Sequence, residues 1–155
     1  IAEAFNEALY KAFLGAGIRL PKYKNMIMTV RPEEQEDAVP IAKRFEALGY
    51  RIYATRGTAN TLKEHGVKVI RTNKLEQPAP NLMDLILGHK IDVVIDIPSQ
   101  GVEHQKDGFV IRRNAIETGV NVLTSLDTAE ALVTSLENTD AKKLSLIDIA
   151  TIARR

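Results

Sequence analysis

Short apolar runs alternate with amphipathic helical patterns along most of this chain. The apolar runs occupy residues 25–30, 51–54, 67–72, 91–97 and 121–124. Each is short and rich in β-branched or other apolar residues, which is typical of buried strands. Strands that alternate with helices favour βαβ units, in which parallel strands share one sheet and crossovers are right-handed. Because nearly every residue of 91–97 is apolar, we expect this run to be a central strand covered on both faces.

The intervening patterns predict the helices. Apolar residues lie on one helical face from Ala38 to Leu48, and further helices are expected over residues 58–65, 82–87, 109–118 and 128–136. Glycine follows most of these segments, as it commonly follows helix ends. Pro40 should lie in the first turn of its helix or distort it, because proline has no backbone N–H. Residues 98–107 are predicted to form a polar loop.

The two ends of the chain carry further helical patterns. Residues 2–14 have apolar positions at helical spacing, and a glycine-rich stretch separates them from the rest. This segment is either a helix of a neighbouring domain or an N-terminal helix that packs on this one. Residues 143–153 also have helical spacing. Because the chain begins with Ile1 and not with Met, we expect it to be a piece of a longer protein.

Composition narrows the classes of function. The chain has 155 residues, of which 45% are hydrophobic and 26% charged, as expected for one globular domain. A net charge of +1 predicts no general attraction to nucleic acid or to an anionic membrane. The sequence contains no cysteine, which excludes disulfides and zinc–thiolate sites and fits a cytoplasmic location. No apolar run approaches the roughly 20 residues of a membrane-spanning helix.

The predicted strand ends carry the residues with the most evident chemistry. Ligands of open parallel sheets bind at the carboxyl ends of the strands, beside the point where strand order reverses. Hydroxyl side chains follow most of these strands, and several ends add Arg, Lys or Asn. The candidate residues are Thr29, Arg31, Thr55, Gly57, Thr58, Asn73, Lys74 and Ser99. Hydroxyls, cations and helix N-termini together are suited to binding a phosphate.

The same residues have ordinary structural interpretations. Thr and Ser at helix starts are common caps worth about 1 kcal/mol each, and we expect Thr58 to cap its helix. Gly57 could serve only a tight turn. The adjacent Arg112 and Arg113, expected near the start of a helix, point about 100° apart, so at most one of them should face a given ligand.

Several segments resemble a known family when they are taken in order. They read "MIMTVRPEE", "YATRGTANTLKEHGV", "NKLEQPAPNLMDLI" and "DGFVIRRNAIETGVNVLT". Together with the initial "IAEAFNEALYKAFLGAG", they resemble the C-terminal allosteric domain of the large subunit of carbamoyl-phosphate synthetase, which has the methylglyoxal-synthase-like fold. The ordered set covers nearly the whole chain and is specific, whereas any single segment is not.

The resemblance implies a fold and a domain organisation. The fold would be α/β, a three-layer α/β/α arrangement with a five-stranded parallel sheet in the order 3-2-1-4-5. Residues 1–20 would be the helix and linker from the preceding ATP-grasp region, and residues 21–155 the regulatory domain. In this family the domain binds UMP, IMP or phosphoribosyl pyrophosphate. The positions that match effector contacts are Thr29, Thr55, Gly57, Thr58, Asn73 and Lys74.

The resemblance also implies a parent enzyme. That ligase makes carbamoyl phosphate from glutamine or ammonia, bicarbonate and ATP, with Mg²⁺ or Mn²⁺, for pyrimidine or arginine biosynthesis. Its partners would be the rest of the large subunit and the glutaminase small subunit. The present fragment is expected to be regulatory and non-catalytic, with no cofactor and no metal of its own.

Some positions depart from the family pattern. After the fourth strand this chain reads Asp96-Ile97-Pro98-Ser99, where nucleotide-binding members carry an Asn-Thr-Thr/Ser type segment. Asp96 would repel a nearby phosphate by about 1 kcal/mol or more unless it is screened or paired. Gln35 is neutral where some members have a phosphate-binding Lys. These changes would fit a synthetase that supplies arginine and is not controlled by pyrimidines.

Two other functions stay open. The first is a degenerate domain that binds no ligand and only mediates subunit contacts. The second is methylglyoxal synthase, which needs a carboxylate base and a His beside a phosphate site. Asp84 and His104 are the nearest candidates, but residues 76–81 replace the glycine-rich segment that carries the catalytic Asp.

Overall fold

The computed structural model describes residues 8, 11, 12, 15 and 22–138, without the side chains of residues 102–105. Most of the helix predicted over 2–14 and all of the pattern at 143–153 lie outside the described residues. The chain divides into two compact units, residues 19–129 and residues 1–18 with 130–155. The fold and the candidate site below belong to the first unit. The second contributes helical residues to the described part at 130–138.

One parallel sheet forms the centre of the first unit. Its strands are β1 (Asn25–Val30), β2 (Arg51–Ala54), β3 (Val69–Arg71), β4 (Val93–Ile97) and β5 (Asn121–Leu123). They lie in the order β3-β2-β1-β4-β5, and each neighbouring pair is parallel. This order confirms the predicted fold class. It also places the reversal of strand order between β1 and β4.

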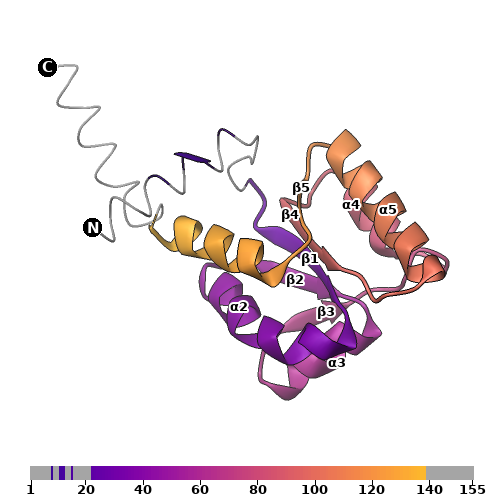
Figure 1. The fold of residues 1–155 in the computed structure, drawn as a ribbon, viewed down its shortest axis with the longest axis horizontal. Coiled ribbons are helices and arrows are strands. Elements are labelled where there is room, and N and C mark those ends of the chain that lie inside the picture. Colours follow the sequence, from indigo (N-terminus) through magenta and orange to yellow (C-terminus); the bar gives the residue numbers. More distant parts are fainter. Residues whose placement is uncertain (1–7, 9–10, 13–14, 16–21, 139–155) are drawn as a thin grey trace, which may run out of the picture. The chain divides into compact units, whose positions relative to one another are not determined.

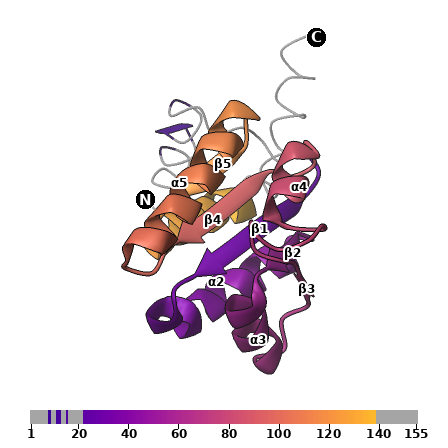
Figure 2. The same ribbon diagram turned by 90° about the vertical axis from the view of Figure 1, so that its right-hand side faces the viewer.

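Helices cover both faces of the sheet. They are α2 (Gln35–Ala47), α3 (Arg56–Glu64), α4 (Leu82–Leu87) and α5 (Val102–Glu117), and a 3₁₀ turn, η1 (Pro32–Glu34), precedes α2. Figures 1 and 2 show α2 and α3 on one face of the sheet and α4 and α5 on the other. The first unit therefore has the three layers that the sequence predicted.

The two central strands, β1 and β4, contribute much of the core. All five residues of β4 are buried, as the apolar run predicted. Ile27 and Val94 are fully buried and belong to the same core cluster as Ile86 and Ile111 of the covering helices. Each such side chain contributes about 1.5–3 kcal/mol when it leaves water, so this face alone strongly stabilises the sheet.

Several predicted boundaries were wrong. Residues 98–107 are not all loop, because α5 already begins at Val102 after Gly101, whose φ is 140°. The first two turns of α5 are polar and have no side-chain cap, so the apolar spacing became visible only from Phe109. Arg112 and Arg113 consequently lie in the second half of the helix. Pro40 lies inside α2, beyond its first turn.

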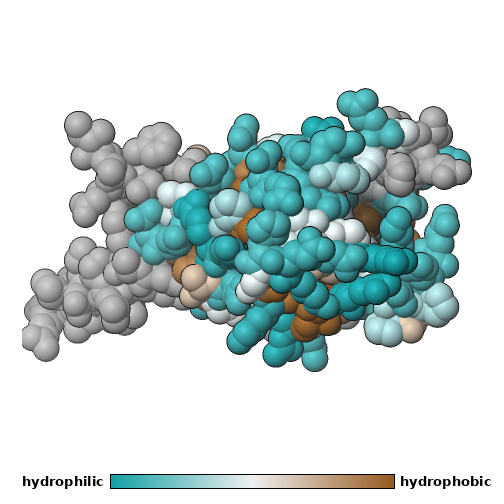
Figure 3. Space-filling model, turned by 90° about the horizontal axis from the view of Figure 1, so that it is seen from below, coloured by the Kyte–Doolittle hydropathy of each residue, from teal (hydrophilic) through white to brown (hydrophobic). Residues whose placement is uncertain are grey.

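The strands and α3 differ from prediction by a few residues. β3 spans Val69–Arg71 and β4 spans Val93–Ile97, both shorter than their apolar runs. Helix α3 begins at Arg56, two residues earlier than predicted. Of the helices described, none has the length and apolar character needed to cross a bilayer. Over the face shown in Figure 3, hydrophilic side chains predominate and hydrophobic ones form only small patches.

Candidate functional site

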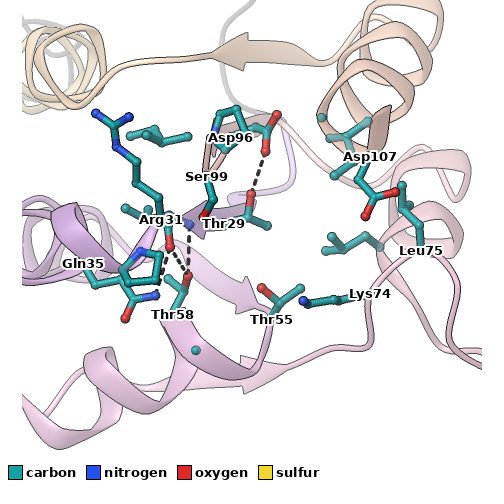
Figure 4. Close-up of a pocket in the computed structure, with 18 residues that line it drawn as sticks. Thr29, Arg31, Gln35, Thr55, Thr58, Lys74, Leu75, Asp96, Ser99 and Asp107 are labelled. Carbon is teal, nitrogen blue, oxygen red and sulfur yellow. Dashed lines mark hydrogen bonds between the residues drawn. The ribbon is translucent and has the colours of Figure 1, made fainter. Parts of the chain in front are cut away.

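A cavity of about 320 Å³ opens at the carboxyl ends of β1, β2 and β4. It lies beside the reversal of strand order, where open parallel sheets bind ligands. Thr29 of β1 and Asp96 of β4 are register partners across this point. The lining residues come from β1 and the turn after it, the start of α3, the loop after β3, the end of β4, and α4 and α5. Figure 4 shows how the labelled side chains surround the cavity.

Seven of the eight candidate residues from the sequence line this cavity. They are Thr29, Arg31, Thr55, Gly57, Thr58, Lys74 and Ser99. The eighth, Asn73, does not line it, and its side-chain amide donates to the Pro78 carbonyl at 2.9 Å. Asn73 instead lines a neighbouring cavity on the other side of Gly57 and Lys74. The fold thus brings together residues that are up to 70 positions apart in the sequence.

The start of α3 presents free donors to the cavity. Thr55 is the N-cap residue, with an extended backbone and no capping hydrogen bond from its side chain. The first turn of α3 also contains no acidic residue. The N–H groups of Gly57 and Thr58 therefore have no side-chain acceptor from the cap, and the positive end of the helix dipole is not neutralised there. Such a helix end is suited to binding a phosphate.

Thr58 does not cap its helix, contrary to the sequence prediction. It is the third residue of α3, and its hydroxyl accepts from the Val30 N–H at 3.0 Å and donates to the Val30 carbonyl at 3.2 Å. Thr58 is only 2% exposed. Its hydroxyl thus joins α3 to the end of β1, and its proton is already used. A phosphate could bind the backbone N–H of Thr58 but not, without breaking this link, its hydroxyl.

Gln35 strengthens the same junction. Its side-chain amide donates to the Val30 carbonyl at 3.0 Å and accepts from the Thr61 hydroxyl at 2.8 Å. A Cβ added to Gly57 would lie 3.2 Å from the Gln35 amide nitrogen, so a side chain there would push against this link. Gln35 therefore holds the end of β1 against α3, in a position where its neutral amide also faces the cavity.

Loss of the Thr58 hydroxyl should destabilise the fold measurably. We expect Thr58→Val to lower the free energy of unfolding by about 1–3 kcal/mol, because both backbone groups of Val30 lose a buried partner. The matched control is Thr61→Val, one turn later, whose hydroxyl makes a single bond to Gln35; its cost should be about 0.5–1.5 kcal/mol. Urea denaturation of the three proteins measures both changes. Equal effects of the two substitutions would contradict this role of Thr58.

The two basic candidates lie differently. Arg31 pairs with Glu34, and Figure 4 shows its guanidinium directed away from Thr29 and Lys74. Lys74 has its backbone held by a hydrogen bond to the Gln77 side chain at 3.0 Å, and its ammonium points toward Thr55. Within the described residues Lys74 makes no ion pair. It is therefore the cation of this cavity that remains available to a ligand beside the start of α3.

Asp96 is a buried carboxylate with two partners. It is 3% exposed, accepts from the Thr29 hydroxyl at 2.8 Å, and accepts from Arg112 Nη1 at 3.1 Å. Burial raises the pKa of Asp96 above its usual 3.8, although Thr29 and Arg112 oppose that shift, and the nearby charge of Asp107 adds to it. The repulsion that the sequence predicted between Asp96 and a phosphate is thus reduced by pairing with Arg112.

Gly108 makes room for this pair. A Cβ added at Gly108 would come within 2.9 Å of Arg112 Nη1 and 3.1 Å of Asp96 Oδ2. Arg112 lies one turn after Gly108 on α5, so both positions face β4. A glycine inside a helix usually costs about 0.5–1 kcal/mol relative to alanine. Here a larger residue would have to displace the Arg112 guanidinium from its place beside Asp96.

Sequence reasoning missed part of the wall. Asp107, Gly108 and Ile111 of α5 line the cavity, together with Leu75 and Leu82. Asp107 and Gly108 were missed because α5 was expected to begin at Phe109, and Ile111 because its apolar side chain gave no sign of a binding role. One signal in the sequence could have predicted this wall. Gly108 and Arg112 are four residues apart and therefore lie on one face of a helix, which could pack against Asp96.

The residues considered for a methylglyoxal synthase are placed elsewhere or not described. Asp84 does not line the cavity, and its carboxylate accepts from the Asn81 N–H at 2.9 Å in a capping box. The side chain of His104 is outside the described residues. In the described part of the chain, no group of three or more acidic or His side chains is arranged to hold a metal ion.

Comparison with known proteins agrees with the fold. A family model of the MGS-like domain matches residues 37–124, more than half of the chain. The carbamoyl phosphate synthase large chains of Lachnoclostridium phytofermentans and Agathobacter rectalis are each 61% identical to it, over 152 and 153 residues. Each of these matches covers 98% of this chain and 14% of the relative.

A more distant relative gives the same match over a shorter stretch. The large chain of Clostridium botulinum strain Langeland is 42% identical over 134 residues, which cover 86% of this chain and 12% of that protein. The chain spans about one seventh of the length of the first two relatives. The match to the family model, the strand order and the similarity to these relatives show that the chain belongs to the family of MGS-like domains.

Proposed function

We propose that the cavity binds a phosphorylated effector that also carries hydroxyl groups, such as a nucleotide or a sugar phosphate. The observation that carries this proposal is the uncapped start of α3, which faces the cavity beside the ammonium of Lys74. The phosphate would accept from the N–H groups of Gly57 and Thr58 and from the Thr55 hydroxyl. Lys74 would add a charge-assisted hydrogen bond.

The opposite wall suits the hydroxyl-bearing part of such a ligand. Asp96 and Asp107 offer carboxylate oxygens, which accept from hydroxyl donors and disfavour a second phosphate at this place. Leu75, Leu82 and Ile111 add apolar surface for a base or another flat group. The volume of about 320 Å³ is at the lower end of the range usual for small-molecule sites.

The relatives support a regulatory role within a larger ligase. We propose that the chain is the allosteric domain of a carbamoyl phosphate synthase large chain, non-catalytic in itself. It would tune ATP-dependent carbamoyl phosphate synthesis for pyrimidine or arginine biosynthesis in the cytoplasm. ATP and Mg²⁺ or Mn²⁺ would act in the parent enzyme, whose other parts and glutaminase subunit would be the partners. Residues 1–20 would connect the domain to the preceding region.

Regulation of this kind needs only differential binding. An effector that binds one conformation of the parent more tightly shifts its equilibrium, typically by about 1–3 kcal/mol. The carboxylates of Asp96 and Asp107 would make the site selective, because they favour effectors whose hydroxyl groups lie within hydrogen-bond distance of them. Asp96 stands at the start of the segment that resembles the Asn-Thr type segment of nucleotide-binding members, so the preferred effector need not be a pyrimidine nucleotide.

Calorimetric titration of the chain with UMP, IMP and phosphoribosyl pyrophosphate tests the proposal. At least one of them should bind below millimolar concentration, and ribose 5-phosphate should bind more tightly than ribose. If none binds at millimolar concentration, the chain is a non-binding domain that serves subunit contacts. Formation of methylglyoxal from dihydroxyacetone phosphate would instead identify a free enzyme of the same fold.

A further inference from the structure

A second cavity lies at the carboxyl end of β3, next to the first. Its volume is about 330 Å³, and Arg56, Gly57, Arg71, Thr72, Asn73, Lys74 and Gln77 line it. Gly57 and Lys74 line both cavities. The start of α3 thus separates two spaces, with Thr55 and Thr58 on one side and Arg56 on the other.

The charge of the second cavity is uniformly positive. Arg56, Arg71 and Lys74 are its charged lining residues, and no acidic residue lines it. None of the three forms a salt bridge with any residue that the structure describes. In the first cavity, by contrast, Arg31 pairs with Glu34 and Asp96 with Arg112. Three cations left together without a counter-ion repel one another, and an anion bound between them would remove that repulsion.

Thr72 gives an independent indication of a missing partner. It is 6% exposed, lines the second cavity, and its hydroxyl has no hydrogen-bond partner among the residues that the structure describes. Its backbone N–H is already used by the Ala54 carbonyl at 2.9 Å. Buried hydroxyls are nearly always hydrogen-bonded, so this orphan beside a cationic cavity is a candidate partner for a ligand oxygen, which would reach it after a small movement of the wall.

We propose that the second cavity binds a second phosphoryl group, so that a diphosphate ester spans the start of α3. The first phosphoryl group lies beside Thr55, the second lies among Arg56, Arg71 and Thr72, and Lys74 contacts both. The ester-linked part extends toward Asp96 in the first cavity. This inference rests on the proposed function for the first phosphoryl group, and it assigns the terminal group to residues that the family resemblance did not single out.

The test compares UMP with UDP, which share every group except the added phosphoryl. Both are titrated into the chain by calorimetry in a metal-free buffer. Inorganic phosphate and pyrophosphate are titrated in parallel, because they make the same comparison without a base or a ribose. UDP should bind at least about tenfold more tightly than UMP, as one or two charge-assisted hydrogen bonds require. Arg71→Ala should remove that difference and leave the affinity for UMP within twofold. Thr72→Val should reduce it.

Lys68→Ala is the matched control, because Lys68 is an exposed cation at the other end of β3. It changes the net charge as Arg71→Ala does, and it should leave the preference for UDP intact. If Lys68→Ala and Arg71→Ala reduce the preference for UDP equally, the preference comes from the net charge of the chain, and the second phosphoryl site is overturned. Binding of UMP and phosphate with no preference for UDP and pyrophosphate would overturn the second site alone. Failure of all four ligands, and of IMP and phosphoribosyl pyrophosphate in the titrations above, would overturn the proposed function as well.

Discussion

Lys74→Ala is expected to weaken binding of a phosphorylated effector by about 10- to 100-fold, and Lys74→Glu to abolish it. A hydrogen bond between an ammonium and a phosphate contributes about 1.5–3 kcal/mol, which corresponds to that range of affinity. Among the described residues, the other cation that lines the first cavity is Arg31, which pairs with Glu34 and points away from Lys74. Calorimetry with the effector found in the initial titrations measures the change.

The matched control for Lys74 is Lys90→Ala. Lys90 is exposed and precedes β4, so it lies at the amino end of the sheet, away from the cavity. This substitution should leave the affinity unchanged within twofold. Lys74→Arg should retain most of the binding, since the charge is kept. If Lys74→Ala binds the effector as tightly as the wild type, the position proposed for the phosphate is wrong. If Lys74→Ala and Lys90→Ala lose the same affinity, the loss reflects only the change in net charge.

Arg112→Ala is expected to lower the free energy of unfolding by about 2–3 kcal/mol at pH 7. The substitution leaves the carboxylate of Asp96 buried with Thr29 as its remaining partner. Removing one partner of a buried pair typically costs about 3–5 kcal/mol; we expect less, because the Arg112 side chain is 31% exposed and partly screened.

The cost of Arg112→Ala should depend on pH in a defined direction. The pKa of Asp96 is raised above 3.8 by burial, and loss of Arg112 raises it further because Arg112 opposes that shift. The folded state then holds a proton that the unfolded state releases, so stability falls as the pH rises through the window between the two pKa values. The penalty should therefore be smaller at pH 4 than at pH 7, because Arg112 compensates only the ionised form of Asp96.

Urea denaturation at several pH values measures this dependence, and Asp96→Asn provides the critical comparison. Asparagine keeps an acceptor for Thr29 but has no charge, so Arg112→Ala in that background should cost less and its cost should not change with pH. Glu76→Gln, which alters an exposed carboxylate in the loop after β3, is the control. A penalty that is the same at pH 4 and pH 7 would contradict a charge-based role for the pair.

Much of the fold could be predicted from the pattern of apolar residues alone. The five strands and most helices appeared as runs and spacings, because burial on both faces of a parallel sheet leaves a direct mark in the sequence. The start of α5 did not appear, because its first two turns are polar and uncapped. The strand order came only from the family resemblance, since apolar runs do not say which strands are neighbours.

The pattern of strands in the sequence was enough to predict which residues meet at the candidate site, but the role of each residue there depends on its tertiary contacts. Seven of eight predicted residues line one cavity because parallel strands bring their carboxyl ends to one edge. The Thr58 link to Val30 joins residues 28 apart, and the Asp96–Arg112 pair joins residues 16 apart. Such partners depend on strand register and on how α3 and α5 pack, which local sequence does not contain.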